Sequence, residues 1–169
     1  MKQLNIPQYP DLQTKIDPDG VTRIYDRLIQ HWVALTPEEW VRQNFTSWLI
    51  YGKGYPKTLL ANEVGIKLNG MTRRIDTIVF ARDGRTPLCI VEYKSPDVSI
   101  SAATFRQAAR YNIVMRAPLL IISNGLKHYC ALVDAGNPVP RYLPQIPDYV
   151  ELESYSHRIN VGIDGGPAK

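Results

Sequence analysis

A short stretch, Leu88-Cys89-Ile90-Val91-Glu92-Tyr93-Lys94-Ser95-Pro96, constrains the fold more than any other part of the 169-residue sequence. Its apolar beginning predicts a buried β-strand, and its end carries a carboxylate and an ammonium group two residues apart. Side chains alternate along a strand, so Glu92 and Lys94 point the same way as Ile90. Ionised groups beside a core are costly unless they are paired, bind a metal or act in a functional site. The strand therefore ends either in a site or in a solvated ion pair.

The segments before this strand predict one helix and two more strands. A capping box at Thr36–Glu39, with proline inside it, starts a helix whose apolar positions continue to about Tyr51. Residues 60–68 and 73–81 have strand composition and alternation, and each is followed by a turn sequence rich in Asn, Asp and Gly. Together with the strand at residue 88, they predict a three-stranded antiparallel meander.

The segments after this strand predict a helix and two strands. The helix extends from about Ser101 to Arg116, and its expected apolar seam is Ala102, Phe105, Ala109 and Ile113. Residues 119–123 form a nearly continuous apolar run, as expected of a central strand that is buried on both faces. Residues 128–133 follow a turn and pair with that strand. The predicted fold class is therefore α/β, a mixed central sheet with helices on both sides.

Residues 36–134 form the predicted core domain. Residues 1–35 are expected to be an N-terminal extension that packs on this core, with a short strand at 21–26; residues 27–32 could pair with that strand or wrap the core. Residues 135–169 contain prolines at 138, 140, 144 and 147, so a tail without regular structure is expected to wrap around the body.

Composition restricts the function only weakly. The net charge of +4 is compatible with a phosphate-backbone ligand but does not argue for one by itself. Cys89 and Cys130 lie in apolar runs and predict buried, reduced thiols, which suit the cytoplasm. The N-terminus lacks the apolar region of a signal peptide, and no apolar run approaches the length needed to cross a membrane.

Asp76 is a carboxylate within the apolar run of the second strand. Asp76 and Glu92 lie about equally far from the turn at residues 83–84, so neighbouring strands bring them side by side. Two carboxylates at ~4–6 Å repel each other unless a proton or a cation lies between them. Mg²⁺ is the natural cation, because it prefers oxygen ligands and keeps waters for substrate phosphates. Lys94 would then lie beside the metal-bound water, where it could orient the nucleophile or stabilise developing charge.

Gln107 and Tyr111 are four residues apart on the second helix and so share one helical face. The ordered series Ile75-Asp76 and Glu92-Tyr93-Lys94 resembles the PD-(D/E)XK nuclease superfamily, and Gln107-x-x-x-Tyr111 resembles a motif of one of its branches. This resemblance implies that Gln107 and Tyr111 present their shared face to the site. From Glu38 to about Tyr129, the chain more closely resembles the N-terminal nuclease domain of type I restriction enzyme R subunits. The resembling pieces are Arg74-Ile-Asp76, Ile90-Val-Glu92-Tyr-Lys94-Ser-Pro96, Gln107-Ala-Ala-Arg-Tyr111-Asn112 and Ile122-Ser-Asn124-Gly125.

This resemblance implies a restriction-endonuclease-like fold and a metal-dependent DNA endonuclease. Asp76, Glu92 and the Tyr93 carbonyl would hold Mg²⁺, for which Mn²⁺ can substitute. Lys94 would position the attacking water, and Gln107 and Tyr111 would orient that water or the scissile phosphate.

The resemblance also implies an upstream glutamate on the first helix. Glu39 matches that place best, although it is equally explained as a capping residue, and Glu38 and Glu63 are alternatives. Four arginines could line a DNA groove through phosphate contacts or belong to a solvated face: Arg73, Arg74, Arg106 and Arg110.

The chain departs from the R subunits in one respect. It contains no Gly-x-x-x-x-Gly-Lys-Ser/Thr loop, so no ATP-driven motor is expected on this chain. The expected partners are DNA and a separate motor or specificity subunit. The alternative is a catalytically silent nucleic-acid-binding or assembly module that keeps the nuclease fold.

Overall fold

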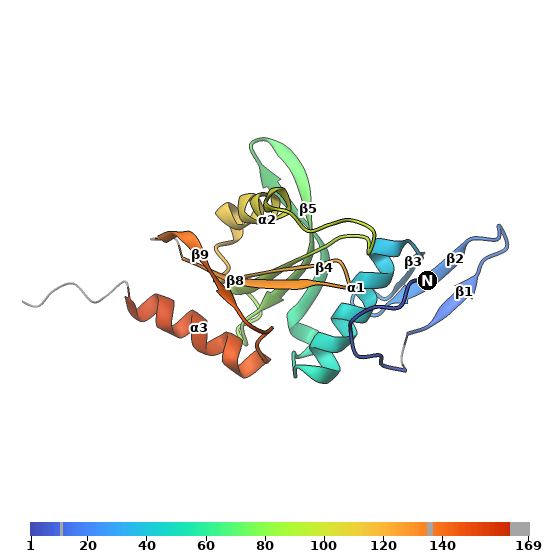
Figure 1. Cartoon of the computed structure of the whole chain (residues 1–169), viewed down its shortest axis with the longest axis horizontal. Helices are drawn as coiled ribbons and strands as arrows, with labels where there is room; N and C mark the ends of the chain where they lie inside the picture. Colours follow the sequence, from blue (N-terminus) through green and yellow to red (C-terminus); the bar gives the residue numbers. More distant parts are fainter. Residues whose placement is uncertain (11, 135–136, 163–169) are drawn as a thin grey trace, which may run out of the picture.

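A six-stranded mixed sheet forms the centre of the structure, a computed structural model that describes residues 1–10, 12–134 and 137–162 (Figure 1). Its strands lie side by side in chain order: β4 (Leu60–Leu68), β5 (Met71–Phe80), β6 (Pro87–Tyr93), β7 (Leu119–Ser123), β8 (His128–Asp134) and β9 (Asn137–Leu143). Strands β6 and β7 run parallel, and the other neighbouring pairs are antiparallel. The parallel pair is joined through helix α2 (Ala102–Met115), since parallel strands need a long crossover. The expected meander and the later strand pair are confirmed.

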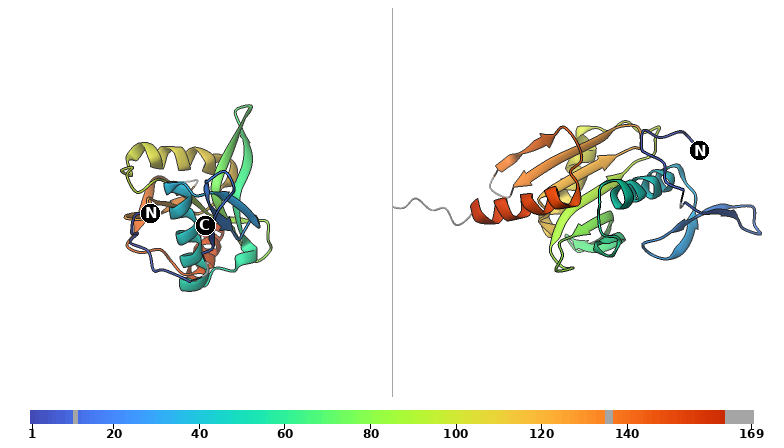
Figure 2. Two further views of the ribbon diagram at one scale, coloured as in Figure 1. Left: turned by 90° about the vertical axis from the view of Figure 1, so that its right-hand side faces the viewer. Right: turned by 90° about the horizontal axis from the view of Figure 1, so that it is seen from below.

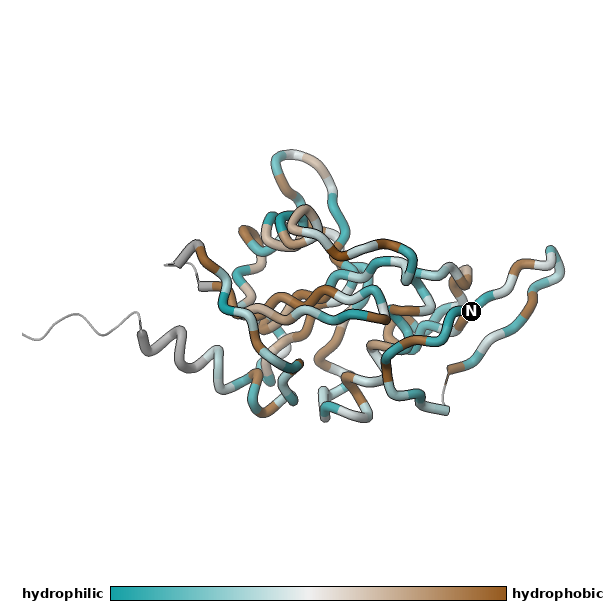
Figure 3. Tube along the Cα trace, in the orientation of Figure 1, coloured by the Kyte–Doolittle hydropathy of each residue, from teal (hydrophilic) through white to brown (hydrophobic). Residues whose placement is uncertain are grey.

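Helices cover both faces of this sheet (Figures 1 and 2). Helix α1 (Pro37–Ser47), the π-helical turn Trp48–Gly52 that continues it, and α3 (Tyr149–Gly162) lie on one face, and α2 lies on the other. A short 3₁₀ turn, Lys57–Leu59, leads into β4. Each face has its own apolar core, and all five residues of β7 are buried between them. Figure 3 shows the apolar segments gathered in the central strands. The α/β sandwich expected from the sequence is confirmed.

A separate three-stranded antiparallel sheet precedes α1. It consists of β1 (Thr14–Ile16), β2 (Thr22–Asp26) and β3 (His31–Ala34), and it projects beside α1 in Figure 1. The expected strand at 21–26 is confirmed, but its partner is His31–Ala34, since residues 27–30 form the turn. Strand β1 was not expected. Ile24 is buried, and Asp26 accepts a hydrogen bond from the Asn62 side chain of β4 at 2.8 Å. These contacts attach the small sheet to the core.

The expectation that prolines exclude regular structure after Asp134 is wrong. Strand β9 pairs with β8, and α3 packs under the sheet. Pro138 and Pro140 lack an N–H group, but β9 is an edge strand with one unpaired side, and residues two apart face the same side. Residues 135–136 and 163–169 of the expected tail lie outside the described residues.

Helix α3 begins after the last of these prolines. The Asp148 carboxylate accepts a hydrogen bond from the backbone N–H of Glu151 at 2.8 Å, which caps the first turn. Leu152 then enters the core shared with α1. The prolines therefore delimit regular elements here rather than preventing them.

The expected apolar seam of α2 is also wrong. Ala102, Ala109 and Ile113 are exposed, and the helix instead buries Thr104 and Ala108 against the sheet. A face that includes Gln107 and Tyr111 lies toward the strands, because Gln107 hydrogen-bonds a buried carboxylate there. Turning the apolar seam inward would remove that donor and leave Lys94 as the remaining donor to a buried carboxylate, and the loss of such a hydrogen bond is costly.

We predict that Leu152→Ala lowers the free energy of unfolding by about 2–5 kcal/mol, because it opens a cavity in the core beneath the sheet. Val150→Ala, two residues earlier on the exposed side of α3, is the control and is expected to change stability by less than about 0.5 kcal/mol. Urea denaturation followed by circular dichroism measures both. Equal, negligible effects would mean that α3 does not contribute to the folded core.

Candidate functional site

The pairing of β5 with β6 sets two carboxylates across from each other. Thr77 pairs with Val91 and Ile78 with Ile90, so the next step of this register sets Asp76 opposite Glu92. The Asp76 Oδ2 atom accepts a hydrogen bond from the backbone N–H of Tyr93 at 2.8 Å. The expected proximity of the two strand carboxylates is confirmed.

Glu92 is the centre of a hydrogen-bonded group and is only 3 % exposed. Its Oε1 atom accepts hydrogen bonds from Lys94 Nζ at 2.9 Å and from Gln107 Nε2 at 2.8 Å. Gln107 Nε2 also lies 3.3 Å from the Tyr111 hydroxyl, which accepts from it. The Glu92 Oε2 atom is buried and has no hydrogen-bond partner among the described residues. Residues predicted from two motifs thus form one hydrogen-bonded group, in which Lys94 and Gln107 bind the Glu92 carboxylate and Tyr111 binds Gln107.

The pKa values of Glu92, Asp76 and Lys94 are all shifted upward, toward the protonated form of each group. Burial, and after it the charge of Asp76, raise the pKa of Glu92 to about 7, although Lys94 acts to lower it. Burial also raises the pKa of Asp76. Burial alone would lower the pKa of Lys94, but the ion pair with Glu92 and the nearby carboxylates of Glu38 and Asp76 outweigh it, so the pKa rises. The carboxylate pair would therefore be stabilised by a further cation.

The two glutamates at the start of the first helix have different surroundings. Burial raises the pKa of Glu38, and the charges of Asp76 and Lys94 act on it next. Glu39 accepts a hydrogen bond from Gln43 at 2.8 Å and pairs with Arg42 at 3.3 Å, while its backbone N–H donates to the Thr36 hydroxyl at 3.1 Å. Thr36 therefore caps α1, Glu39 belongs to the Arg42 network, and Glu38 interacts electrostatically with Asp76 and Lys94.

Arg42 is a site residue that the sequence reasoning missed. Its side chain is 8 % exposed, and its guanidinium lies 3.3 Å from Glu39, 3.3 Å from Glu63 and 3.4 Å from Asp76. These three carboxylates come from α1, β4 and β5, so one cation connects three elements. The sequence signal for Arg42 was its position three residues after Glu39 on the same helix. This signal is weak, because such a pair usually lies on the protein surface.

Glu63 lies in this network with an unusual backbone conformation. Its φ of 55° is in the left-handed region in the middle of β4, which costs energy for a residue with a side chain. Although burial acts to raise it, the pKa of Glu63 is lowered by hydrogen bonds from Arg74 and Arg42. The two arginines thus hold the Glu63 carboxylate beside Asp76.

The charges around the site favour a divalent cation. Five carboxylates and three cationic groups leave a formal charge of −2 when all are ionised: Glu38, Glu39, Glu63, Asp76 and Glu92 against Arg42, Arg74 and Lys94. No group of three or more His, Cys, Asp or Glu side chains with metal-ligand spacing occurs in residues 1–10, 12–134 and 137–162. The fitting donors are therefore the two strand carboxylates, and the free Glu92 Oε2 atom and all-oxygen chemistry suit Mg²⁺.

The four arginines predicted to contact DNA lie on two segments beside the site. Arg73 and Arg74 are exposed on β5 near the β4–β5 turn, and Arg74 pairs with Glu63 at 3.0 Å. Arg106 and Arg110 are exposed one turn apart on α2. Their exposure is compatible with phosphate contacts, which remain a prediction.

The sheet, its helices and the carboxylates in the middle of β5 and near the end of β6 define an α/β fold of the restriction-enzyme type. A solved fragment described as an HsdR subunit of a type I restriction enzyme from Vibrio vulnificus YJ016 has the same fold, with a TM-score of 0.56 and 18 % sequence identity. The match covers 75 % of this chain and 26 % of that chain, so this chain spans about a quarter of its length.

Residues 37–147 match the family described as type I restriction enzyme R protein N terminus, and the chain belongs to this family. The resemblance identified from the strand and helix motifs is thereby confirmed. No curated protein matches the sequence. Within the described part of the chain, no helix has the length and apolar character needed to cross a membrane.

We predict that Arg42→Gln destabilises the fold by about 3–5 kcal/mol, because it leaves three carboxylates without their buried cation. Arg74→Gln is the matched control: it also loses a bond to Glu63, but its side chain is 64 % exposed and the expected cost is below about 1 kcal/mol. Urea denaturation at neutral pH measures both. Similar small losses in the two variants would contradict a central role for Arg42.

Proposed function

We propose that this chain is a metal-dependent DNA endonuclease domain that hydrolyses phosphodiester bonds in restriction or DNA processing. The observation that carries the proposal is the Glu92 carboxylate, which is held by Lys94 and Gln107 beside Asp76 and keeps one buried oxygen without a partner. A buried carboxylate is normally satisfied by hydrogen bonds, so an unpaired oxygen in a cluster of carboxylates favours a bound cation.

Asp76, Glu92 and the carbonyl of Tyr93, the residue between Glu92 and Lys94, are the groups that would hold Mg²⁺ or Mn²⁺. When bound, the metal would supply Lewis acidity toward a phosphate oxygen and make a bound water more acidic. Glu38, whose pKa responds to the charges of Asp76 and Lys94, is the candidate upstream glutamate of the site. Glu39 is less suited to that role, because Gln43 and Arg42 already bind its carboxylate.

Lys94 and the residues of α2 complete the proposed mechanism. The Lys94 side chain is half-buried, so its ammonium group can hold a water between Glu92 and solvent and stabilise charge that develops on the phosphate. Gln107 fixes the orientation of the Glu92 carboxylate, and the Tyr111 hydroxyl, which accepts from Gln107, keeps its own proton for the water or the scissile phosphate. These side chains would bind and orient the water and the scissile phosphate. The flanking phosphates would be contacted by Arg73, Arg74, Arg106 and Arg110.

The proposed partners follow from the family. A chain that matches R protein N-termini and spans a quarter of an HsdR relative is expected to act on DNA with a separate motor or specificity subunit. Cys89 and Cys130 are buried free thiols, which suits the reducing cytoplasm.

A catalytically silent DNA-binding or assembly module is the second candidate. It is favoured by one observation: Arg42 already lies 3.4 Å from the Asp76 Oδ1 atom and so compensates part of the negative charge without a metal. The two functions differ in whether metal binds between the strand carboxylates and whether DNA is cut.

We predict that the wild-type protein nicks supercoiled plasmid DNA with Mg²⁺ or Mn²⁺ and not with EDTA. Glu92→Ala and Lys94→Ala are each expected to reduce the nicking rate by about 100-fold or more, because each removes charge from the reacting centre. Asp19→Ala, which removes an exposed carboxylate of the N-terminal segment, should cut like the wild type. An unchanged nicking rate in both Glu92→Ala and Lys94→Ala would contradict the nuclease assignment.

We also predict that crystals soaked in Mn²⁺ show anomalous density between Asp76 and Glu92. Isothermal titration with Mn²⁺ should show one site in the wild type and at least a tenfold weaker site in Glu92→Gln, which keeps the shape of the side chain and loses its charge. Asp19→Asn is the control for nonspecific binding. The silent module is favoured if DNA affinity is equal with and without metal and no form of DNA is cut.

A further inference from the structure

One long segment of the chain carries cations without any acidic residue. Between Asp97 and Asp134 the sequence has four basic side chains, Arg106, Arg110, Arg116 and Lys127, and no Asp or Glu. All four are exposed. Arg106 and Arg110 lie one turn apart on α2, Arg116 directly follows this helix, and Lys127 lies in the β7–β8 turn. The exposed pair on α2 is complementary to a phosphate backbone.

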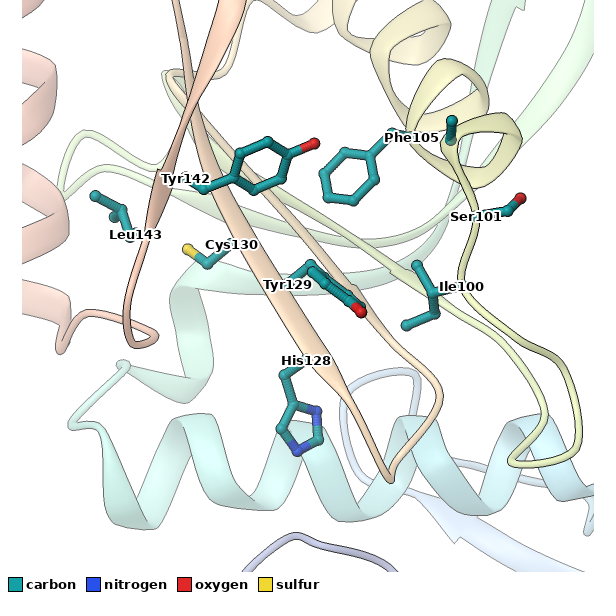
Figure 4. Close-up of a pocket in the computed structure, with 9 residues that line it drawn as sticks. Ile100, Ser101, Phe105, His128, Tyr129, Cys130, Tyr142 and Leu143 are labelled. Atoms are coloured by element: carbon teal, nitrogen blue, oxygen red, sulfur yellow. The ribbon is translucent and has the colours of Figure 1, made fainter.

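An aromatic pocket lies on this part of the molecule (Figure 4). It has a volume of about 470 Å³ and lies between the beginning of α2 and strands β8 and β9. Its lining consists of Ile100, Ser101, Ala102, Phe105, His128, Tyr129, Cys130, Tyr142 and Leu143. The volume is within the range of small-molecule sites, and the lining combines apolar surface with a few hydroxyl groups.

Three rings from three elements converge in this pocket (Figure 4). Phe105 of α2 packs edge-to-face on Tyr142 of β9, with centroids 5.3 Å apart, and on Tyr129 of β8, with centroids 6.1 Å apart. Tyr129 and Tyr142 are nevertheless exposed, Tyr142 by 56 %. Phe105 therefore packs against two tyrosine rings that keep exposed surface on which a ligand can stack.

We propose that this pocket binds an unpaired nucleobase of a DNA strand. Every base has a π-face, so stacking on exposed aromatic rings is tolerant of sequence, and a cationic groove follows the backbone. Here the two tyrosines supply the rings, and the acid-free segment supplies the cations. The inference deepens the proposed function, since it names a single-stranded segment as part of the substrate.

The geometry of α2 connects the pocket to the Glu92 site. Phe105 and Gln107 are two residues apart, which places them on opposite flanks of the helix, one toward the pocket and one toward Glu92. Arg106 and Arg110 lie on the exposed face between these flanks. A helix is about 10 Å across, so a strand whose base enters the pocket can cross α2 over the arginines and reach Lys94.

The test measures binding without cleavage. A labelled oligothymidine and a duplex of the same length are titrated with the protein in EDTA, at one fixed salt concentration, and followed by fluorescence anisotropy. Tyr142→Ala and Tyr129→Ala are expected to weaken binding of the single strand by about 5- to 150-fold, the range of one lost stacking contact, with a much smaller effect on the duplex. Tyr142→Phe keeps the ring and should bind like the wild type.

Tyr51→Ala is the matched control. Tyr51 is exposed by the same 56 %, lies in the π-helical turn after α1 and packs on Tyr9, away from the pocket. This variant should bind single strands normally. Arg106→Gln should weaken binding and reduce the slope of log affinity against log salt by about one, as expected for one lost phosphate contact.

Unchanged single-strand affinity in Tyr142→Ala and Tyr129→Ala overturns the proposal, and so does a duplex loss as large as the single-strand loss. The first result would assign the pocket to a protein partner, and the second would assign it to the duplex. Glu92→Gln separates this proposal from the nuclease assignment: it should retain single-strand binding in EDTA while failing to nick with Mg²⁺.

Discussion

The buried Glu92 carboxylate is the constraint on which most of this structure depends. The antiparallel register of β5 and β6 brings Asp76 opposite it, and burial raises the pKa of both groups. Such a pair persists only where donors and cations surround it. Lys94 directly follows the strand of Glu92, Gln107 comes from the helix on one face, and Arg42 comes from the helix on the other face. The helices are therefore attached to the sheet by the charges of the site as well as by apolar packing.

The rotation of α2 illustrates this coupling. Apolar residues alone would favour a seam through Phe105 and Ile113, yet the helix turns Gln107 toward the sheet and leaves Ile113 exposed. The same rotation leaves Phe105 at the flank, where it supports Tyr129 and Tyr142. One hydrogen bond to a buried carboxylate thus accounts both for the proposed catalytic face of α2 and for the aromatic pocket beside it.

Local patterns were sufficient for the elements from α1 to β8. The Thr36 cap, the strand alternation and the continuous apolar run of β7 follow local rules, and the structure agrees with them. The second half of the expected capping box is absent, because the backbone N–H of Thr36 donates to Ala34 and the Glu39 side chain bonds Gln43. The prolines after Asp134 gave a wrong prediction. A strand can contain proline if it lies at the edge of the sheet, where one side needs no N–H donors, and β9 is such a strand. Edge position is a property of the assembled sheet and has no local signature.

The sequence by itself determined the group Asp76, Glu92 and Lys94, because strand alternation and hairpin spacing fix which faces these side chains share. Gln107 and Tyr111 share one helical face, and their resemblance to a nuclease motif tied that face to the group. Only the tertiary structure decided that Glu38 interacts with Asp76 and Lys94, that Arg42 joins Glu39, Glu63 and Asp76, and that three rings meet beside α2. Those contacts join elements that are far apart along the chain. Their charges and rings interact over a few ångströms in space, a distance that no spacing along the sequence specifies.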